Sequence, residues 1–156
     1  QSILVAGCAQ GGIGLLTIGN GDDGVIVDLS RFNRVNERVR DLEFHPSGDS
    51  LAVVSGNQVT LWEFQSGKRL HQVAETSSQP TRLTFDSSGR ILAVGYDDGS
   101  IRLWQADGQK ELTQPLKTVQ KRITSLSFSP NDRMLAAGSA DTSIRVWELF
   151  RTAKKT

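Results

Sequence analysis

The sequence predicts an all-β protein built from a repeated four-stranded antiparallel sheet, and three observations lead to this fold class. Short apolar segments end in Trp62, Trp104 and Trp147, so the tryptophans lie 42 and 43 residues apart. A fixed period of this length indicates a repeat architecture. Between the tryptophans, apolar and polar residues alternate, as in strands with one buried face, and the 15 glycines fit many tight turns.

Each unit opens on a strand with period-2 alternation of apolar residues. The three strands are expected within residues 39–46, 80–87 and 123–130, and each is followed by a turn rich in Ser, Gly, Asn or Asp. These turn residues reverse the chain through positive φ angles or through side-chain bonds to the backbone. We therefore expect an antiparallel second strand directly after each turn.

The second strands are expected at residues 51–54, 91–94 and 134–137, which are nearly continuous apolar runs. Such runs are typical of strands that are covered on both faces. A polar turn follows each run and leads to a third strand that ends in the tryptophan. A more polar fourth strand is expected at residues 68–73 and 110–113.

These units resemble the blades of WD-repeat β-propellers, and the resemblance covers roughly residues 37–149. The matching positions are Leu42, Phe44 and Pro46, Leu126, Phe128 and Pro130, the Gly-x-x-Asp turns at 95–98 and 138–141, and the three tryptophans. Departures from the family pattern are Glu63, Gln105 and Glu148, which stand where an aspartate usually follows the tryptophan, and the missing Gly-His pair before the first strands. The polar network typical of the family is therefore expected to be partial.

The resemblance implies a β-propeller segment of about four blades, with approximate boundaries 1–36, 37–78, 79–120 and 121–156. Core packing is expected for the three tryptophans because their strict register places each at the same point of its own blade. Asp98 and Asp141 are expected to fix turns by accepting backbone N–H bonds. By resemblance, this role is architectural.

The first 36 residues are expected to form a diverged blade without a tryptophan. Residues 3–7 are assigned as its first strand, residues 15–19 as its second, and residues 22–28 as its turn and third strand. The link to Val39 is short, so the outer strand of this blade is expected to be short or irregular.

Composition excludes several classes of function. Charged residues make up 22% of the chain and the net charge is +1, so no strong field attracts nucleic acid or membranes. No apolar run approaches the roughly 18 residues of a membrane span. A single cysteine, Cys8, excludes an internal disulfide within the chain. We therefore expect a cytoplasmic protein.

At about 40–45 residues per blade, 156 residues supply fewer than four complete blades, whereas propellers close with four to eight. Two interpretations follow. The chain is part of a larger propeller, which we favour because it opens on Gln1, or two copies complete a ring as a homodimer. In the second case residues 3–6 are a candidate for the missing outer strand of the last unit.

No catalytic, cofactor or metal site is expected. The Gly11–Gly14 loop follows an apolar run, which leaves a nucleotide-binding or enzymatic module as an alternative function. A phosphate loop requires a lysine and a following helix, but Leu15 stands at the lysine position. The paired aspartates 22–23 and 97–98 supply too few oxygen ligands for calcium. No nucleophile and acid accompany His45 or His71.

Binding remains as the expected function: a non-catalytic scaffold or sensor that takes a protein or peptide through the propeller rim. The loops entering the first strands lie on one rim, which by resemblance commonly binds partner proteins. Basic residues make this rim mildly positive, so an acidic peptide is the expected ligand. The candidate residues are Arg38, Arg40, Arg82, Lys121 and Arg122. A purely structural role in oligomerisation is a further alternative.

Overall fold

The computed structural model is all-β and describes residues 2–7, 13–18, 25–28, 37–108, 110–117 and 121–149. Within these ranges the chain forms strands and no helix. The strands are β1 (Ser2–Gly7), β2 (Ile13–Ile18), β3 (Val25–Asp28), β4 (Val39–Phe44), β5 (Ser50–Ser55), β6 (Gln58–Glu63), β7 (Arg69–Glu75), β8 (Pro80–Phe85), β9 (Ile91–Tyr96), β10 (Ser100–Gln105), β11 (Leu116–Lys117), β12 (Ile123–Phe128), β13 (Met134–Ser139) and β14 (Ile144–Glu148).

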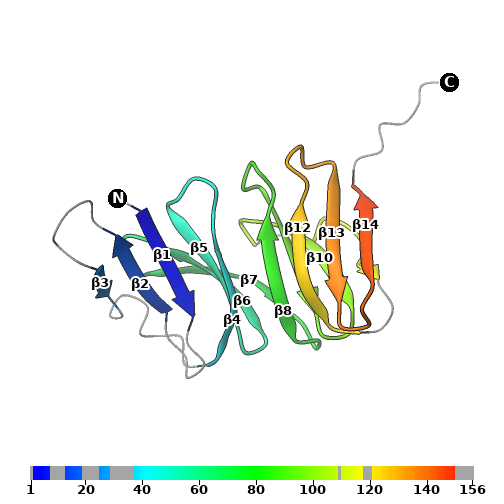
Figure 1. Ribbon diagram of the computed structural model, residues 1–156, viewed down its shortest axis with the longest axis horizontal. Coiled ribbons are helices and arrows are strands. Elements are labelled where there is room, and N and C mark those ends of the chain that lie inside the picture. Colours follow the sequence, from blue (N-terminus) through cyan, green and yellow to red (C-terminus); the bar gives the residue numbers. More distant parts are fainter. Residues whose placement is uncertain are drawn as a thin grey trace.

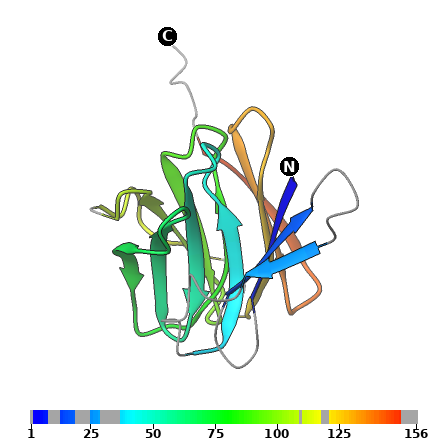
Figure 2. The same cartoon turned by 90° about the vertical axis from the view of Figure 1, so that its left-hand side faces the viewer.

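The strands form four antiparallel sheets that follow one another along the chain. Sheet 1 has the order β1-β2-β3, sheet 2 β4-β5-β6-β7, sheet 3 β11-β10-β9-β8, and sheet 4 β12-β13-β14. Figure 1 shows the sheets side by side in chain order, and Figure 2 shows them from the side of sheet 1, with the strands of neighbouring sheets inclined to one another. The predicted all-β fold of repeated antiparallel sheets is confirmed.

The inner strands β4, β8 and β12 hold the sheets together. Strand β8 contacts both β4 and β12, while the outer strands lie farther from these contacts. Each inner strand begins with a β-bulge, which inserts one extra residue at Arg40, Thr81 or Thr124. A bulge increases the local twist and redirects a side chain at the end of a strand. The bulges therefore shape the end of each sheet where the inner strand starts.

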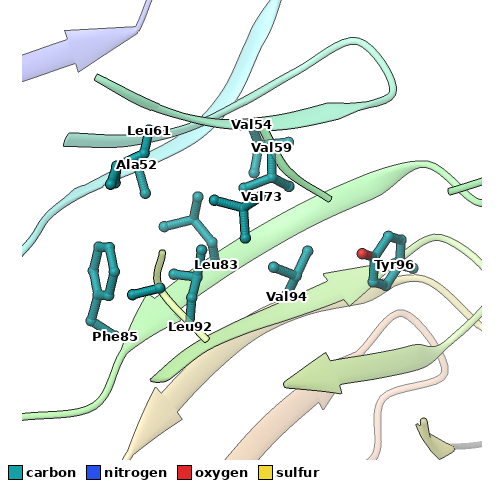
Figure 3. Packing of buried hydrophobic residues seen from close by; sticks show 11 residues of the cluster. Ala52, Val54, Val59, Leu61, Val73, Leu83, Phe85, Leu92, Val94 and Tyr96 are labelled. Atoms are coloured by element: carbon teal, nitrogen blue, oxygen red, sulfur yellow. The ribbon is translucent and has the colours of Figure 1, made fainter. Parts of the chain in front are cut away.

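Apolar faces of neighbouring sheets form the core. Between sheets 2 and 3, Val54, Val59 and Leu61 face Leu83 and Leu92 across the interface, as Figure 3 shows. Between sheets 3 and 4 a second cluster forms around Ile101, Leu103, Ile123 and Leu135. The near-continuous apolar runs predicted for β5 and β9 are largely buried because each strand contributes side chains to clusters on both sides of its sheet, whereas Met134 of β13 is 44% exposed.

The strand order predicted for the first unit is wrong by one strand. Strands β1 and β2 pair in the register of β9 and β10: Leu4 lies opposite Leu16 as Leu92 lies opposite Trp104. Strand β1 also contacts β4, as the second strands β5 and β9 contact the following inner strands. Figure 1 draws β1 pointing the same way as the second strand β13. Residues 3–7 are therefore a second strand, and the stretch predicted as a second strand is a third.

The positions of β1 and β2 bear on two further expectations. Residues 3–6 pair with β2 in sheet 1, so they do not form the outer strand of sheet 4. Residues 8–12 lie outside the described part of the chain, but the residues that follow them form strand β2 and not a helix. A phosphate loop needs that helix, so the nucleotide-binding alternative for the Gly11–Gly14 loop is not supported by the fold.

Candidate functional site

The predicted rim exists as one side of the molecule, which we call the start side because the inner strands β4, β8 and β12 begin there. The loops before β8 and β12 are bonded to the turns between the second and third strands of their sheets. Gln79 and Asp97 exchange two bonds, with N···O distances of 3.0 Å between Asp97 N and Gln79 O and 2.9 Å between Gln79 N and Asp97 Oδ1. In sheet 4, Ala140 N donates to Arg122 O at 2.9 Å. These bonds fix the position of the rim loops.

Three of the predicted basic residues are exposed on the start side. Arg38 precedes β4, and Lys121 and Arg122 precede β12. The backbone beneath the last two is held in place, because the Lys121 carbonyl accepts a bond from Ser139 Oγ at 3.3 Å and the Arg122 carbonyl accepts from Ala140 N. Their charged ends therefore project from a fixed backbone toward solvent.

Arg40 and Arg82 bond to nearby backbone carbonyls. Arg40 Nη1 donates to Gly56 O at 2.6 Å, which ties the bulge of β4 to the adjacent turn. Arg82 Nη1 donates to Thr81 O at 2.6 Å. Both side chains are half-buried. We therefore infer that these two arginines shape the rim, while Arg38, Lys121 and Arg122 are the residues that it presents.

The turn aspartates on the start side accept local hydrogen bonds. Asp98 Oδ1 accepts from Ser100 N at 2.9 Å and from Ser100 Oγ at 2.6 Å, and Asp98 Oδ2 accepts from Ser78 Oγ at 2.8 Å. Partial burial opposes ionisation of Asp98, but these bonds hold its pKa below the usual range. Asp141 accepts the equivalent pair from Ser143, and those bonds lower its pKa as well. Both carboxylates thus have the geometry of turn-fixing residues.

The three tryptophans lie in three separate apolar clusters and form no common cage. Trp62 is buried and its Nε1 donates to Thr60 Oγ1 at 2.8 Å. Trp104 packs against the cluster between sheets 2 and 3, which includes Tyr96. Trp147 packs against the cluster between sheets 3 and 4. Their surroundings are those of core residues.

Two carboxylates that the sequence analysis did not single out join the inner strands β4 and β8. Asp41 Oδ2 accepts from Leu83 N at 2.9 Å, and Glu43 Oε1 accepts from Phe85 N at 3.4 Å. Burial raises the pKa of both carboxyls, although the bonds to β8 act in the opposite direction. The signal in the sequence was an acid at two alternate positions of an inner strand, a pattern that β8 and β12 lack.

Both histidines connect sheet 2 to sheet 3 on the opposite side of the molecule, which we call the end side because β4, β8 and β12 end there. His45 Nε2 lies 2.9 Å from Gly89 O, and its ring packs edge-on against Phe85. His71 Nε2 lies 3.1 Å from Ala106 O. His45 is half-buried and contacts the next sheet.

The described residues contain no group of three or more His, Cys, Asp or Glu that is placed to hold a metal ion. Cys8 and the aspartates 22–23 lie outside the described residues. Among the described segments, none forms a helix long and apolar enough to cross a membrane.

Comparison with protein families identifies the repeat. The family model described as "WD domain, G-beta repeat" (WD40) matches residues 67–105 and 113–148. Each match runs from the outer part of one sheet through the third strand of the next, and each ends one residue after a tryptophan. Sheets 3 and 4 therefore carry the repeat in the register predicted from Trp104 and Trp147.

Curated proteins with similar sequences include WD-repeat proteins. The chain is 30% identical over 73 residues to the Periodic tryptophan protein 2 homolog of Schizosaccharomyces pombe, covering 46% of this chain and 8% of that protein. It is 26% identical over 105 residues to the WD repeat-containing protein 91 homolog of Dictyostelium discoideum, covering 56% of this chain and 14% of that protein. The chain thus spans only a small part of the length of these relatives.

A solved structure shares the fold. The structure of U3-55K superposes on 72% of this chain with a TM-score of 0.67 and 22% sequence identity, and the match covers 36% of that protein. At this identity the likeness concerns the fold alone. It agrees with the sheet arrangement of a β-propeller in which the described sheets are consecutive blades.

Proposed function

Because the chain carries WD40 repeats, whose proteins generally serve as protein-interaction scaffolds, we propose that it is a non-catalytic scaffold that binds a partner protein through the start side. The observation that carries the proposal is the exposure of Arg38, Lys121 and Arg122 on one side, at the starts of two inner strands. The backbone of Lys121 and Arg122 is fixed by hydrogen bonds to Ser139 and Ala140, so little ordering of this loop is needed when a partner binds.

The partner that fits this side is an acidic peptide or an acidic protein surface. Arginine guanidinium groups bind carboxylates in bidentate pairs and are enriched at interface hot spots. Arg40 and Arg82 contribute indirectly, because their bonds to Gly56 O and Thr81 O hold the rim backbone. Such binding depends on charge, so it weakens as salt is added.

Charge reversal at the rim tests the proposal. The probe is a fluorescein-labelled peptide of alternating Glu and Leu, and the variant is Arg38→Glu with Arg122→Glu. We expect about a tenfold or larger loss of affinity, which corresponds to roughly 1.4 kcal/mol. The matched control is Arg133→Glu, an exposed arginine on the end side. If fluorescence anisotropy shows that the peptide binds the variant with Arg38→Glu and Arg122→Glu as tightly as it binds the Arg133→Glu control, the proposal is contradicted.

A second candidate function, assembly of a ring from two copies, is favoured by the outward face of sheet 4. Ile144 and Val146 are 79% and 59% exposed, and contiguous apolar surface of this kind promotes association. Light scattering behind a sizing column distinguishes the states. A dimer that Ile144→Asp converts to a monomer would support assembly of two copies through this face. A monomer in the unmodified chain would remove this candidate.

A further inference from the structure

In the part of the chain that the structure describes, two residues other than glycine have a left-handed backbone conformation. Asp132 has a φ of 56° and Thr142 a φ of 71°. Both lie in turns of sheet 4: Asp132 between β12 and β13 on the end side, and Thr142 between β13 and β14 on the start side. Aspartate tolerates this conformation, but a β-branched residue such as threonine rarely adopts it. The turn at Thr142 is therefore strained.

The equivalent turn of sheet 3 has a glycine at this position. Gly99 has a φ of 81°, and its N–H donates to Tyr96 O at 3.3 Å, three residues back. Thr142 N donates to Ser139 O at 3.1 Å in the same way. Three-residue hairpin turns of this kind commonly place glycine in the left-handed conformation. A glycine at 142 would make the same turn without strain, so the turn itself does not require threonine.

The two strained residues differ in what their side chains do within the described chain. The Asp132 carboxylate accepts bonds from Ser87 N at 2.9 Å and from Ser87 Oγ, so it connects sheet 4 to sheet 3. The Thr142 side chain is exposed, and its hydroxyl makes no hydrogen bond to a described residue. The contacts of the described chain thus explain the aspartate but not the threonine.

Thr142 lies beside the basic residues that sheet 4 presents on the start side. Its turn is bonded to the loop before β12, because Ala140 N donates to Arg122 O at 2.9 Å and Ser139 Oγ donates to Lys121 O at 3.3 Å. Figure 1 shows this turn at the end of sheet 4 where β12 begins. One small surface therefore carries both cations and a free hydroxyl.

The carboxylate next to Thr142 is engaged within its own turn. Asp141 Oδ1 accepts from Ser143 N at 2.9 Å and from Ser143 Oγ at 2.6 Å. These bonds lower the pKa of Asp141, and the nearby guanidinium of Arg145 lowers it further. Arg145 thus offsets the charge of Asp141, and the surface formed with Lys121 and Arg122 stays basic.

We propose that Thr142 is a contact residue of the start-side binding site, where its hydroxyl donates to a partner carboxylate that also pairs with Arg122. This inference rests on the proposed function. A hydrogen bond to an ionised acceptor is stronger than one between neutral groups. The strain in the turn persists because threonine supplies a donor that glycine lacks, as occurs at other binding sites with strained backbone.

The test compares Thr142→Gly with Thr142→Asn in the 156-residue chain. Glycine relieves the strain and removes the donor, whereas asparagine tolerates the left-handed conformation and keeps side-chain N–H donors. Both variants should therefore unfold at a higher urea concentration than the parent. In fluorescence anisotropy, Thr142→Gly should bind the peptide of alternating Glu and Leu about tenfold more weakly, because a bond to a charged group is lost. Thr142→Asn should stay within about threefold of the parent.

The variant with Arg38→Glu and Arg122→Glu, measured alongside, separates this inference from the proposed function. If that variant weakens binding but Thr142→Gly does not, the inference is wrong and the proposed function stands. Equal losses for Thr142→Gly and Thr142→Asn would overturn the role of the donor. A lower urea midpoint for Thr142→Gly would overturn the argument from strain. If the charge-reversed variant binds like the parent, the proposed function fails and this inference fails with it.

Discussion

The faces of sheets 2 and 3 that meet the following sheet and the outward face of sheet 4 are built from the same repeat but differ completely in burial. Val59 and Ile101 are fully buried, yet Ile144 at the equivalent position is 79% exposed. Leu61 and Leu103 are 7% and 4% exposed, whereas Val146 is 59% exposed. The repeat sets which side chain is apolar, but the next sheet along the chain determines whether that side chain is buried.

The two faces of β14 sharpen this comparison within one strand. Trp147 points back toward sheet 3 and packs against the cluster of Ile101 and Leu103. Val146, its neighbour in sequence, points the other way and is exposed. Side chains of a strand alternate between faces, so one strand has both a core face and a surface face.

The largest expected effect is at the tryptophans, which all point toward the preceding sheet. Trp104→Ala should lower the free energy of unfolding by roughly 3–5 kcal/mol, because it removes a large side chain packed between sheets 2 and 3. Thermal and urea denaturation followed by circular dichroism measure the change. A variant that melts within about a degree of the parent would show that this interface does not stabilise the fold.

A matched pair of isoleucines tests the comparison itself. Ile101→Ala should lower the free energy of unfolding by about 2–4 kcal/mol, since it leaves a cavity between sheets 3 and 4. Ile144→Ala should change it by less than about 0.5 kcal/mol, because the side chain is exposed. Similar losses for the two variants in urea denaturation would mean that another surface covers sheet 4.

A smaller effect is expected at the carboxylates between β4 and β8. Burial raises the folded-state pKa of Asp41 above its usual range, so the ionised form destabilises the fold at neutral pH. This destabilisation disappears as pH falls through the raised pKa. Asp41→Asn removes the charge and keeps an acceptor for Leu83 N.

We therefore expect the parent to gain stability relative to the Asp41→Asn variant as the pH falls from 7 to about 4. The gain in the free energy of unfolding should be less than about 1 kcal/mol. Urea denaturation at several pH values measures it. The opposite trend, with the parent losing stability relative to the variant on acidification, would show that the bonds to β8 outweigh the effect of burial. Asp41→Ala is the control, because it leaves Leu83 N without this acceptor.

Much of the fold could be predicted from the sequence because three units repeat the same pattern around Trp62, Trp104 and Trp147. The first unit was placed one strand out of register because Leu16 replaces the tryptophan that marks the third strand. The run from Ile3 to Gly7 matches Ile91 to Gly95 without a gap, so the information was present. Pairing of Leu4 with Leu16 reveals it directly.

The sites were less predictable because they depend on contacts between sheets. The sequence places Arg40 and Arg82 near the rim, but only the structure reveals that both donate to nearby carbonyls. A groove of about 700 Å³ between sheets 3 and 4 is lined by Leu112, which lies outside any strand, and by Trp147 of the next sheet. Residues from two different repeats form it, so no motif within one repeat indicates it.

Hydrogen–deuterium exchange of the 156-residue chain, read by mass spectrometry, tests the central comparison most directly. Peptides covering β6 and β10 should exchange slowly, because these strands are paired on both edges and covered by a following sheet. The peptide covering β14 should exchange much faster. Equal protection of β14 and β10 would contradict the account, since it would mean that both the outer edge and the outward face of sheet 4 are covered.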